Sequence, residues 1–193
     1  QTRVEGIVSK VMGKPMSCQS RECIQAGKKD CTLHLTETRQ FEVITGVARK
    51  PRQESLTCGD SYSFTAVKDG KYLLALSDGM GSGARAAEES SAVISLLENF
   101  LEAGFDQNIT IKTINSILML RSREEMFATA DLCIMDLVGA TADFIKIGGV
   151  PSFIRRRDKV EIIKQSALPI GILEEVQLEN ISVPIYDEDM IVM

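Results

Sequence analysis

The most informative part of the sequence reads Gly59-Asp60-Ser61-Tyr62-Ser63 and then Leu76-Ser77-Asp78-Gly79-Met80-Gly81. Two apolar stretches lie between the two aspartates, and Lys68-Asp69-Gly70-Lys71 joins them. Asp-Gly between two such stretches is a strong signal for a β-hairpin. Asp60 would then begin the first strand and Asp78 would end the second. Because these two strand ends meet in a hairpin, we expect both carboxylates at the same edge of a sheet.

Two neighbouring carboxylates suggest a site for a hard divalent cation. Oxygen ligands favour Mg²⁺ or Mn²⁺ over zinc. The alternative is that Asp60 and Asp78 merely cap their turns, as aspartate often does.

The composition fits one domain with an N-terminal extension. The chain has 193 residues and 44% hydrophobic content, enough for one core. We interpret residues 1–40 as an extension of short strands and loops, and residues 41–193 as the domain. A net charge of −5 disfavours nucleic acid as a partner, because nucleic-acid-binding surfaces concentrate positive charge. No apolar run approaches the ~20 residues that span a bilayer.

Five cysteines in a chain without a secretion signal favour reduced thiols in a cytosolic setting. Cys18, Cys23, Cys31 and His34 have a spacing that is compatible with a zinc knuckle, since zinc takes four nitrogen or sulfur ligands. The first gap is wide for a tight knuckle, so free thiols are favoured and structural zinc is the alternative.

The periodicity along the chain predicts an α+β fold. Residues 41–48 are β-branched and apolar and predict a strand, followed by a polar turn over residues 50–54. Apolar residues recur at helical spacing over residues 84–103, where Gly104 ends the helix. A second helix is expected to begin at Thr110 as its N-cap. Further strands are expected at 130–137, 142–147, 152–156, 160–164, 178–184 and 189–193.

These motifs resemble the metal-dependent PP2C-type (PPM) serine/threonine phosphatases, and within them the phosphatase domains of the stage II sporulation protein E group. The resemblance lies in the two aspartate motifs, the second of which continues through Ser82-Gly83-Ala84-Arg85-Ala86. Further matches are Lys112–Leu118, Phe144–Gly148, Pro151–Ile154 and Leu168–Ile172. Several motifs in the order of the family are more specific than a single Asp-Gly turn.

The resemblance implies an antiparallel β-sandwich flanked by helices and a site with two Mn²⁺ or Mg²⁺ ions. Asp60 and Asp78 match the catalytic metal carboxylates of the family, and the Gly79 carbonyl matches a backbone metal ligand. In this family two ions activate a bridging water that attacks the phosphorus of a phosphoserine or phosphothreonine. Relatives carry further acidic ligands downstream of a position equivalent to Met193. We therefore expect a fold that is incomplete at the C-terminus and weak activity from this chain alone.

The substrate implied by the resemblance is a phosphorylated anti-sigma-factor antagonist, whose dephosphorylation activates a sporulation sigma factor. A related stress-response or signalling phosphatase is one alternative. A non-catalytic module that binds a phosphoprotein is another, and intact Asp60, Asp78 and Gly79 argue against it. The resemblance also implies a cytoplasmic domain whose parent protein is anchored at the cell membrane through an upstream region. A homodimer is left open.

Other residues are weaker candidates. His34 lies outside the matched motifs, so no histidine acid can be assigned. Ser61 and Ser77 have no histidine base nearby in sequence, which argues against a serine nucleophile. For Asp131 we favour a carboxylate at an edge or a cap, with reach into the site as the alternative. Residues 155–159 are rich in arginine and lysine, and a hairpin tip is favoured over a grip on a phosphorylated partner.

Overall fold

The computed structural model describes the chain except residues 1, 24–30, 51–57, 82, 122–126 and 177. It divides into two compact units, residues 1–42 and residues 43–193. Each unit is described by itself.

The first unit begins with a helix that the sequence analysis did not predict. Helix α1 (Thr2–Met12) precedes an antiparallel hairpin of β1 (Met16–Cys23) and β2 (Cys31–Glu37). The expectation of short strands and loops alone was therefore wrong. Gly6 and several β-branched valines lower the helix propensity of this segment. The apolar side chains of α1 are exposed, with Ile7 at 56% and Val11 at 80% exposure, so packing against a core does not stabilise this helix.

The zinc prediction lies partly outside the described residues. Cys18 is a free thiol whose Sγ donates to the Ser20 carbonyl, and His34 lies opposite Ser20 in the β1–β2 register. Nothing is described of the Cys23 and Cys31 side chains. The zinc site therefore stays a prediction.

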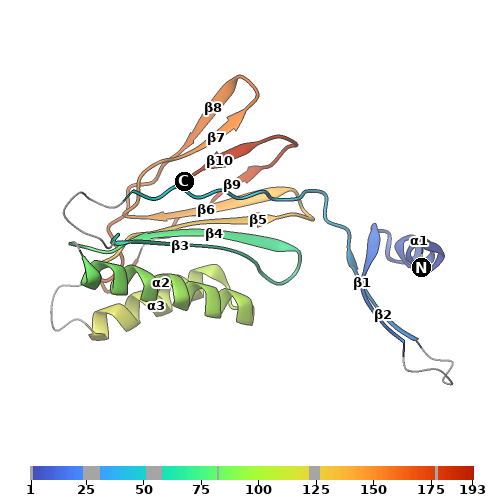
Figure 1. The fold of residues 1–193 in the computed structure, drawn as a ribbon, viewed down its shortest axis with the longest axis horizontal. Helices are drawn as coiled ribbons and strands as arrows, with labels where there is room; N and C mark the ends of the chain where they lie inside the picture. Colours follow the sequence, from blue (N-terminus) through green and yellow to red (C-terminus); the bar gives the residue numbers. More distant parts are fainter. Residues whose placement is uncertain (1, 24–30, 51–57, 82, 122–126, 177) are drawn as a thin grey trace. The chain divides into compact units, whose positions relative to one another are not determined.

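The described residues of the second unit form two antiparallel sheets. The larger has the strand order β3-β4-β5-β6-β9 and the smaller has the order β10-β7-β8. Hairpins form the pairs β3–β4, β5–β6 and β7–β8, and two helices separate β4 from β5 (Figure 1). This is the α+β fold that the periodicity predicted. The strand bounds are β3 Asp60–Ala66, β4 Lys71–Asp78, β5 Ala130–Asp136, β6 Thr141–Ile147, β7 Ser152–Arg156, β8 Lys159–Ile163, β9 Ile181–Pro184 and β10 Met190–Val192.

Both predicted helices are present, although one begins earlier than expected. Helix α2 (Ala84–Ala103) ends at Gly104, which has φ 91° in the left-handed region that favours glycine. Helix α3 (Gln107–Arg121) begins after Asp106, whose carboxylate accepts from the backbone of the first turn. Thr110 is therefore not the N-cap. It lies fully buried inside the helix, and Asp106 provides the cap instead.

The two helices form a layer on one face of the larger sheet (Figure 1). The core between this helical layer and the sheet is apolar and almost completely buried, because the apolar stripe of each helix packs on the inward side chains of the strands. Every residue of β5 from Ala130 to Met135 is buried, as expected for a central strand covered on both faces. Large members of this core are Leu73, Val93, Leu97, Ile111, Ile114, Leu132, Ile145 and Ile147.

The strand predicted at residues 41–48 is absent. This segment has no ladder partner among the described residues, and Ile44 is 95% exposed. A β-branched pattern alone does not make a strand, because strand hydrogen bonds need a neighbour. The turn predicted at residues 50–54 lies mostly outside the described residues.

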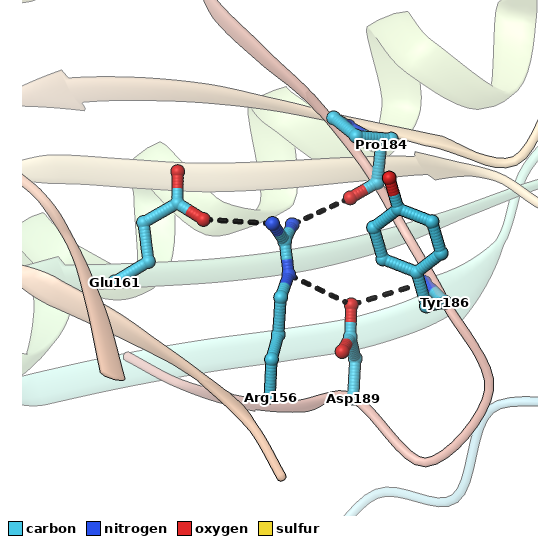
Figure 2. A network of polar contacts seen from close by, with 5 residues as sticks. All are labelled: Arg156, Glu161, Pro184, Tyr186 and Asp189. Atoms are coloured by element: carbon cyan, nitrogen blue, oxygen red, sulfur yellow. Dashed lines mark hydrogen bonds and ion pairs between the residues drawn. The ribbon is translucent and has the colours of Figure 1, made fainter. Parts of the chain in front are cut away.

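A polar cluster joins the smaller sheet to the larger one. The Arg156 guanidinium contacts Glu161 Oε2 at 2.8 Å, Asp189 Oδ2 at 3.2 Å and the Pro184 carbonyl at 2.6 Å (Figure 2). The Tyr186 ring lies against the same guanidinium, and its backbone N–H donates to Asp189. Since Pro184 ends β9 and Arg156 ends β7, one side chain ties the two sheets together.

Candidate metal centre

The structure brings Asp60 and Asp78 together as predicted. They are direct partners in the β3–β4 register, at the open end of the hairpin. Partial burial raises the pKa of Asp78 above 3.8, and the adjacent Asp60 carboxyl raises it further through a hydrogen bond and like charge. The two carboxyl groups are therefore close enough to repel each other when both are ionised.

Backbone contacts from distant parts of the chain hold the Asp78 turn in place. The Asp78 N–H donates to Thr129 Oγ1 at 2.8 Å, and the Thr129 N–H donates to the Asp78 carbonyl at 2.9 Å. Gly79 forms a bridge with Ala128. Thr129 was not found from the sequence, since it lies 51 residues from Asp78 and belongs to none of the quoted motifs.

Gly79 is required by close approach of the backbone to α2. A Cβ added there would lie 2.0 Å from the Ala86 carbonyl oxygen, so no larger residue fits without movement. The Gly79 N–H donates to the Gly59 carbonyl at 3.4 Å, which connects the two aspartate turns. Gly79 thus follows Asp78 directly and is bonded through its N–H to the residue before Asp60.

Two further side chains lie beside Asp60 that the sequence analysis did not single out. Arg49 donates from Nη2 to the Asp60 carbonyl at 2.6 Å, and its guanidinium lies 5.6 Å from the centre of the Tyr62 ring. The Cys58 thiol donates to Asp60 Oδ2 at 3.3 Å. Arg49 is exposed, so donors of its guanidinium are available to a ligand.

The donor set fits part of a Mg²⁺ or Mn²⁺ site. Of the ion pairs formed between described residues, none includes Asp60 or Asp78, so their negative charge is not neutralised by a lysine or arginine partner. A hard cation would relieve this repulsion. In the described part of the chain no group of three or more His, Cys, Asp or Glu side chains is arranged to hold a metal. Among the described residues, Asp60 and Asp78 are the paired carboxylates of the site, and the Gly79 carbonyl stays the predicted third ligand.

Asp131 does not face an edge, contrary to our expectation. It is 4% exposed in the middle of the larger sheet, and its Oδ2 lies 3.0 Å from Lys146 Nζ. Lys146 also donates to Ser152 at 2.9 Å, and all three side chains are buried. Burial raises the pKa of Asp131, and the Lys146 ammonium opposes that rise. A buried partner of opposite charge is what makes an acid tolerable inside the sheet.

The basic segment at residues 155–159 forms a hairpin tip, as favoured. Arg156 is opposite Lys159 in the β7–β8 register, and Arg157 has φ 50° in the turn. Arg156 is engaged in the polar cluster described above. Ser77 is 2% exposed, which disfavours a nucleophile at that position, and Ser61 bonds to Ser90.

Comparisons with known proteins now identify the family. Residues 68–193 match the family described as Stage II sporulation protein E (SpoIIE). The chain is 41% identical to Stage II sporulation protein E of Priestia megaterium over 187 residues, 97% of this chain and 32% of that protein. The chain belongs to the stage II sporulation protein E family. It is also 47% identical to the Bacillus subtilis member over 156 residues, 81% of this chain and 19% of that protein.

The solved structures give the same family and the same fold. The structure of the PP2C phosphatase domain of SpoIIE from Bacillus subtilis, with a fragment of its regulatory domain, matches with a TM-score of 0.79. It is 38% identical, and the match covers 99% of this chain and 57% of that one. RsbX in complex with magnesium shares the fold at a TM-score of 0.60 and 21% identity, over 72% of this chain and 67% of that one. The PP2C-like sandwich expected from the sequence is thereby confirmed.

The chain spans about a third or less of the length of these curated relatives. Among its described helices, none is both long and apolar enough to cross a membrane.

Proposed function

We propose that this chain is part of a metal-dependent protein serine phosphatase. The observation that carries the proposal is the direct pairing of Asp60 with Asp78, beside Gly79, in a chain of the SpoIIE family. Family membership alone would support the fold, whereas the intact carboxylate pair supports the chemistry.

Asp60, Asp78 and the Gly79 carbonyl would hold Mn²⁺ or Mg²⁺. When bound, the ions would activate water and neutralise charge that develops on the phosphoryl group. The protein contributes the position of the carboxylates. The hairpin register and the two Thr129 hydrogen bonds fix them before any cation arrives.

Arg49 is the side chain of this site that suits the phosphoryl group of a substrate. Its guanidinium is held by the Asp60 carbonyl on one side and lies against Tyr62, so its position is set. A guanidinium presents several N–H donors in a plane and binds phosphate oxygens well. It would orient the phosphoserine next to the two carboxylates.

The proposed substrate is a phosphorylated anti-sigma-factor antagonist, and its dephosphorylation would activate a sporulation sigma factor. Membership of the SpoIIE family supports this choice. We also propose that residues 41–193 form the phosphatase domain and residues 1–40 an extension. The parent protein would be anchored at the membrane by an upstream region, with this domain in the cytoplasm.

The test is hydrolysis of phosphoserine by the parent protein expressed from its complete gene. Asp78→Asn should reduce Mn²⁺-dependent turnover by at least ~100-fold, because half of the carboxylate pair loses its charge. Arg49→Ala should mainly raise KM for the phosphoprotein. Asp69→Asn, the same chemical change in the distal hairpin turn, is the control and should retain activity.

The outcomes separate the alternatives. Turnover of a different phosphoprotein, with none on the anti-sigma-factor antagonist, would favour a related signalling phosphatase. Tight binding of phosphoprotein without turnover would indicate a non-catalytic module and would refute the proposed activity. Near-native turnover by Asp78→Asn would remove Asp78 from the site.

A further inference from the structure

The edge strand β3 is joined to α2 by hydroxyl groups. Ser61 bonds to Ser90 at 2.8 Å, and Ser63 donates to the Glu98 carboxylate. The next strand, β4, instead contributes Leu73 and Ala75 to the apolar core shared with α2. Hydrogen bonds depend more strongly on direction than apolar contacts do, so they can set the position of β3 along the helix.

Among these β3–α2 contacts, Ser90 is the residue that lies next to the candidate metal centre. Its Oγ lies 2.6 Å from the Gly59 carbonyl and 2.8 Å from Ser61 Oγ, and Ser90 has no exposed surface. Gly59 and Ser61 are the residues on either side of Asp60. A hydroxyl has one hydrogen to donate. Both contacts form hydrogen bonds when Ser90 donates its hydrogen to the Gly59 carbonyl and accepts the hydrogen of Ser61.

The same carbonyl also reaches the second aspartate turn. Gly59 O accepts from the N–H of Gly79, the residue after Asp78, at 3.4 Å. Ala86, one helical turn before Ser90, contacts both turns: a Cβ on Gly59 would lie 3.1 Å from Ala86 Cβ, and one on Gly79 would lie 2.0 Å from Ala86 O. Both aspartate turns therefore pack against the first turns of α2.

We infer that Ser90 is a positioning residue of the metal centre, which orients Asp60 through the Gly59 carbonyl and the Ser61 hydroxyl. The inference rests on the proposed function, since it assumes that Asp60 and Asp78 hold a cation. Ligand geometry must be kept within ~0.5 Å for a site to work. Loss of groups that orient ligands typically costs ~10–100-fold in metal affinity. Removing the Ser90 hydroxyl leaves the Gly59 carbonyl without its shortest hydrogen bond and frees the turn to move.

The test compares three serine-to-alanine variants of this chain. Ser90→Ala removes the positioning hydroxyl. Ser63→Ala removes the other hydroxyl contact between β3 and α2 without touching the Gly59 turn. Ser91→Ala makes the same change at the neighbouring exposed position of α2. Mn²⁺ is titrated into ¹⁵N-labelled protein, and paramagnetic loss of the amide signals around Asp60 and Gly79 reports binding even when affinity is weak.

Ser90→Ala should raise the Mn²⁺ concentration at half signal loss by ~10-fold, the lower end of the expected range. Ser63→Ala and Ser91→Ala should change it by less than about twofold, although Ser63→Ala also weakens the joint and lowers the melting temperature. Hydrogen exchange of the Gly79 amide, measured without metal, should accelerate in Ser90→Ala more than in the other two variants.

Each result decides one of the two proposals. Equal Mn²⁺ midpoints and equal Gly79 exchange in Ser90→Ala and Ser63→Ala would overturn the positioning role and leave the metal site intact. If Mn²⁺ broadens no signals near Asp60 or Asp78 in the wild-type chain, the proposed metal site of this chain fails. The metal-free exchange measurement would then still decide whether Ser90 holds the turn.

Discussion

Replacing Asp78 by asparagine should make this chain slightly more stable in the absence of metal. Asp78 lies directly opposite Asp60 in the hairpin, and like charges in that position are destabilising by ~0.2–1 kcal/mol. Solvent screening keeps the effect at the low end, since Asp78 is largely exposed. For a chain of this length 1 kcal/mol corresponds to ~2–4 °C in Tm, so a gain of about 0.2–0.5 kcal/mol raises the Tm by ~0.4–2 °C.

The sign of the pH dependence follows from the raised pKa of Asp78. The folded protein binds this proton more tightly than the unfolded chain, so stability falls as pH rises above 3.8 through the folded pKa. Asp78→Asn removes that loss. Its gain over wild type should therefore be present at pH 7 and vanish as pH falls well below 3.8, where the Asp78 carboxyl is protonated in both the folded and the unfolded chain.

Thermal unfolding with EDTA, and then with Mn²⁺, measures the effect. Asp69→Asn is the matched control, because Asp69 lies in the hairpin turn with φ 59°, a conformation that asparagine tolerates. Mn²⁺ should raise the Tm of wild type and of the control more than that of Asp78→Asn. A lower Tm for Asp78→Asn than for Asp69→Asn in EDTA would refute the repulsive pair.

Three other substitutions test the contacts around the site. Lys146→Met should lower the free energy of unfolding in urea by about 3–5 kcal/mol, because it leaves the Asp131 carboxylate buried without its partner; a loss under 1 kcal/mol would show that the pair is not isolated from water. Gly79→Ala should cost about 1–3 kcal/mol by steric overlap with α2, whereas Gly46→Ala, with no atom within 4 Å of its added Cβ, should change stability by less than ~0.5 kcal/mol. Asp106→Ala should lower the free energy of unfolding by ~1 kcal/mol through loss of the α3 N-cap. A urea titration followed by circular dichroism measures this change, and an unchanged free energy of unfolding would contradict the capping role of Asp106.

The local elements of the fold could be predicted because their signals are local. Asp-Gly between two apolar stretches specified the β3–β4 hairpin, and its register then placed Asp60 opposite Asp78. The three-and-four spacing of apolar residues specified α2, and Gly104 marked its end. Each of these features depends on residues within one helix or one hairpin.

The features that were missed depend on distant partners. Thr129 reaches Asp78 across 51 residues, and Asp131 is stabilised inside the sheet by Lys146 on the next strand. Residues 41–48 have a strand-like composition, but no described strand pairs with them. The N-cap of α3 is a local exception: threonine often caps a helix, but here the Asp106 carboxylate accepts from the backbone N–H groups of Asn108 and Ile109.

The insertion of two helices between β4 and β5 has a consequence for folding kinetics. The β3–β4 hairpin closes locally and can form early, whereas the hydrogen bonds from Thr129 to Asp78 require α2 and α3 to be accommodated between the two strands. The hairpin can therefore pair Asp60 with Asp78 early, but Thr129 holds the Asp78 backbone only once this long-range contact forms. Substitutions that slow the docking of α2 and α3 should delay the appearance of metal binding during refolding, even where the final affinity is unchanged.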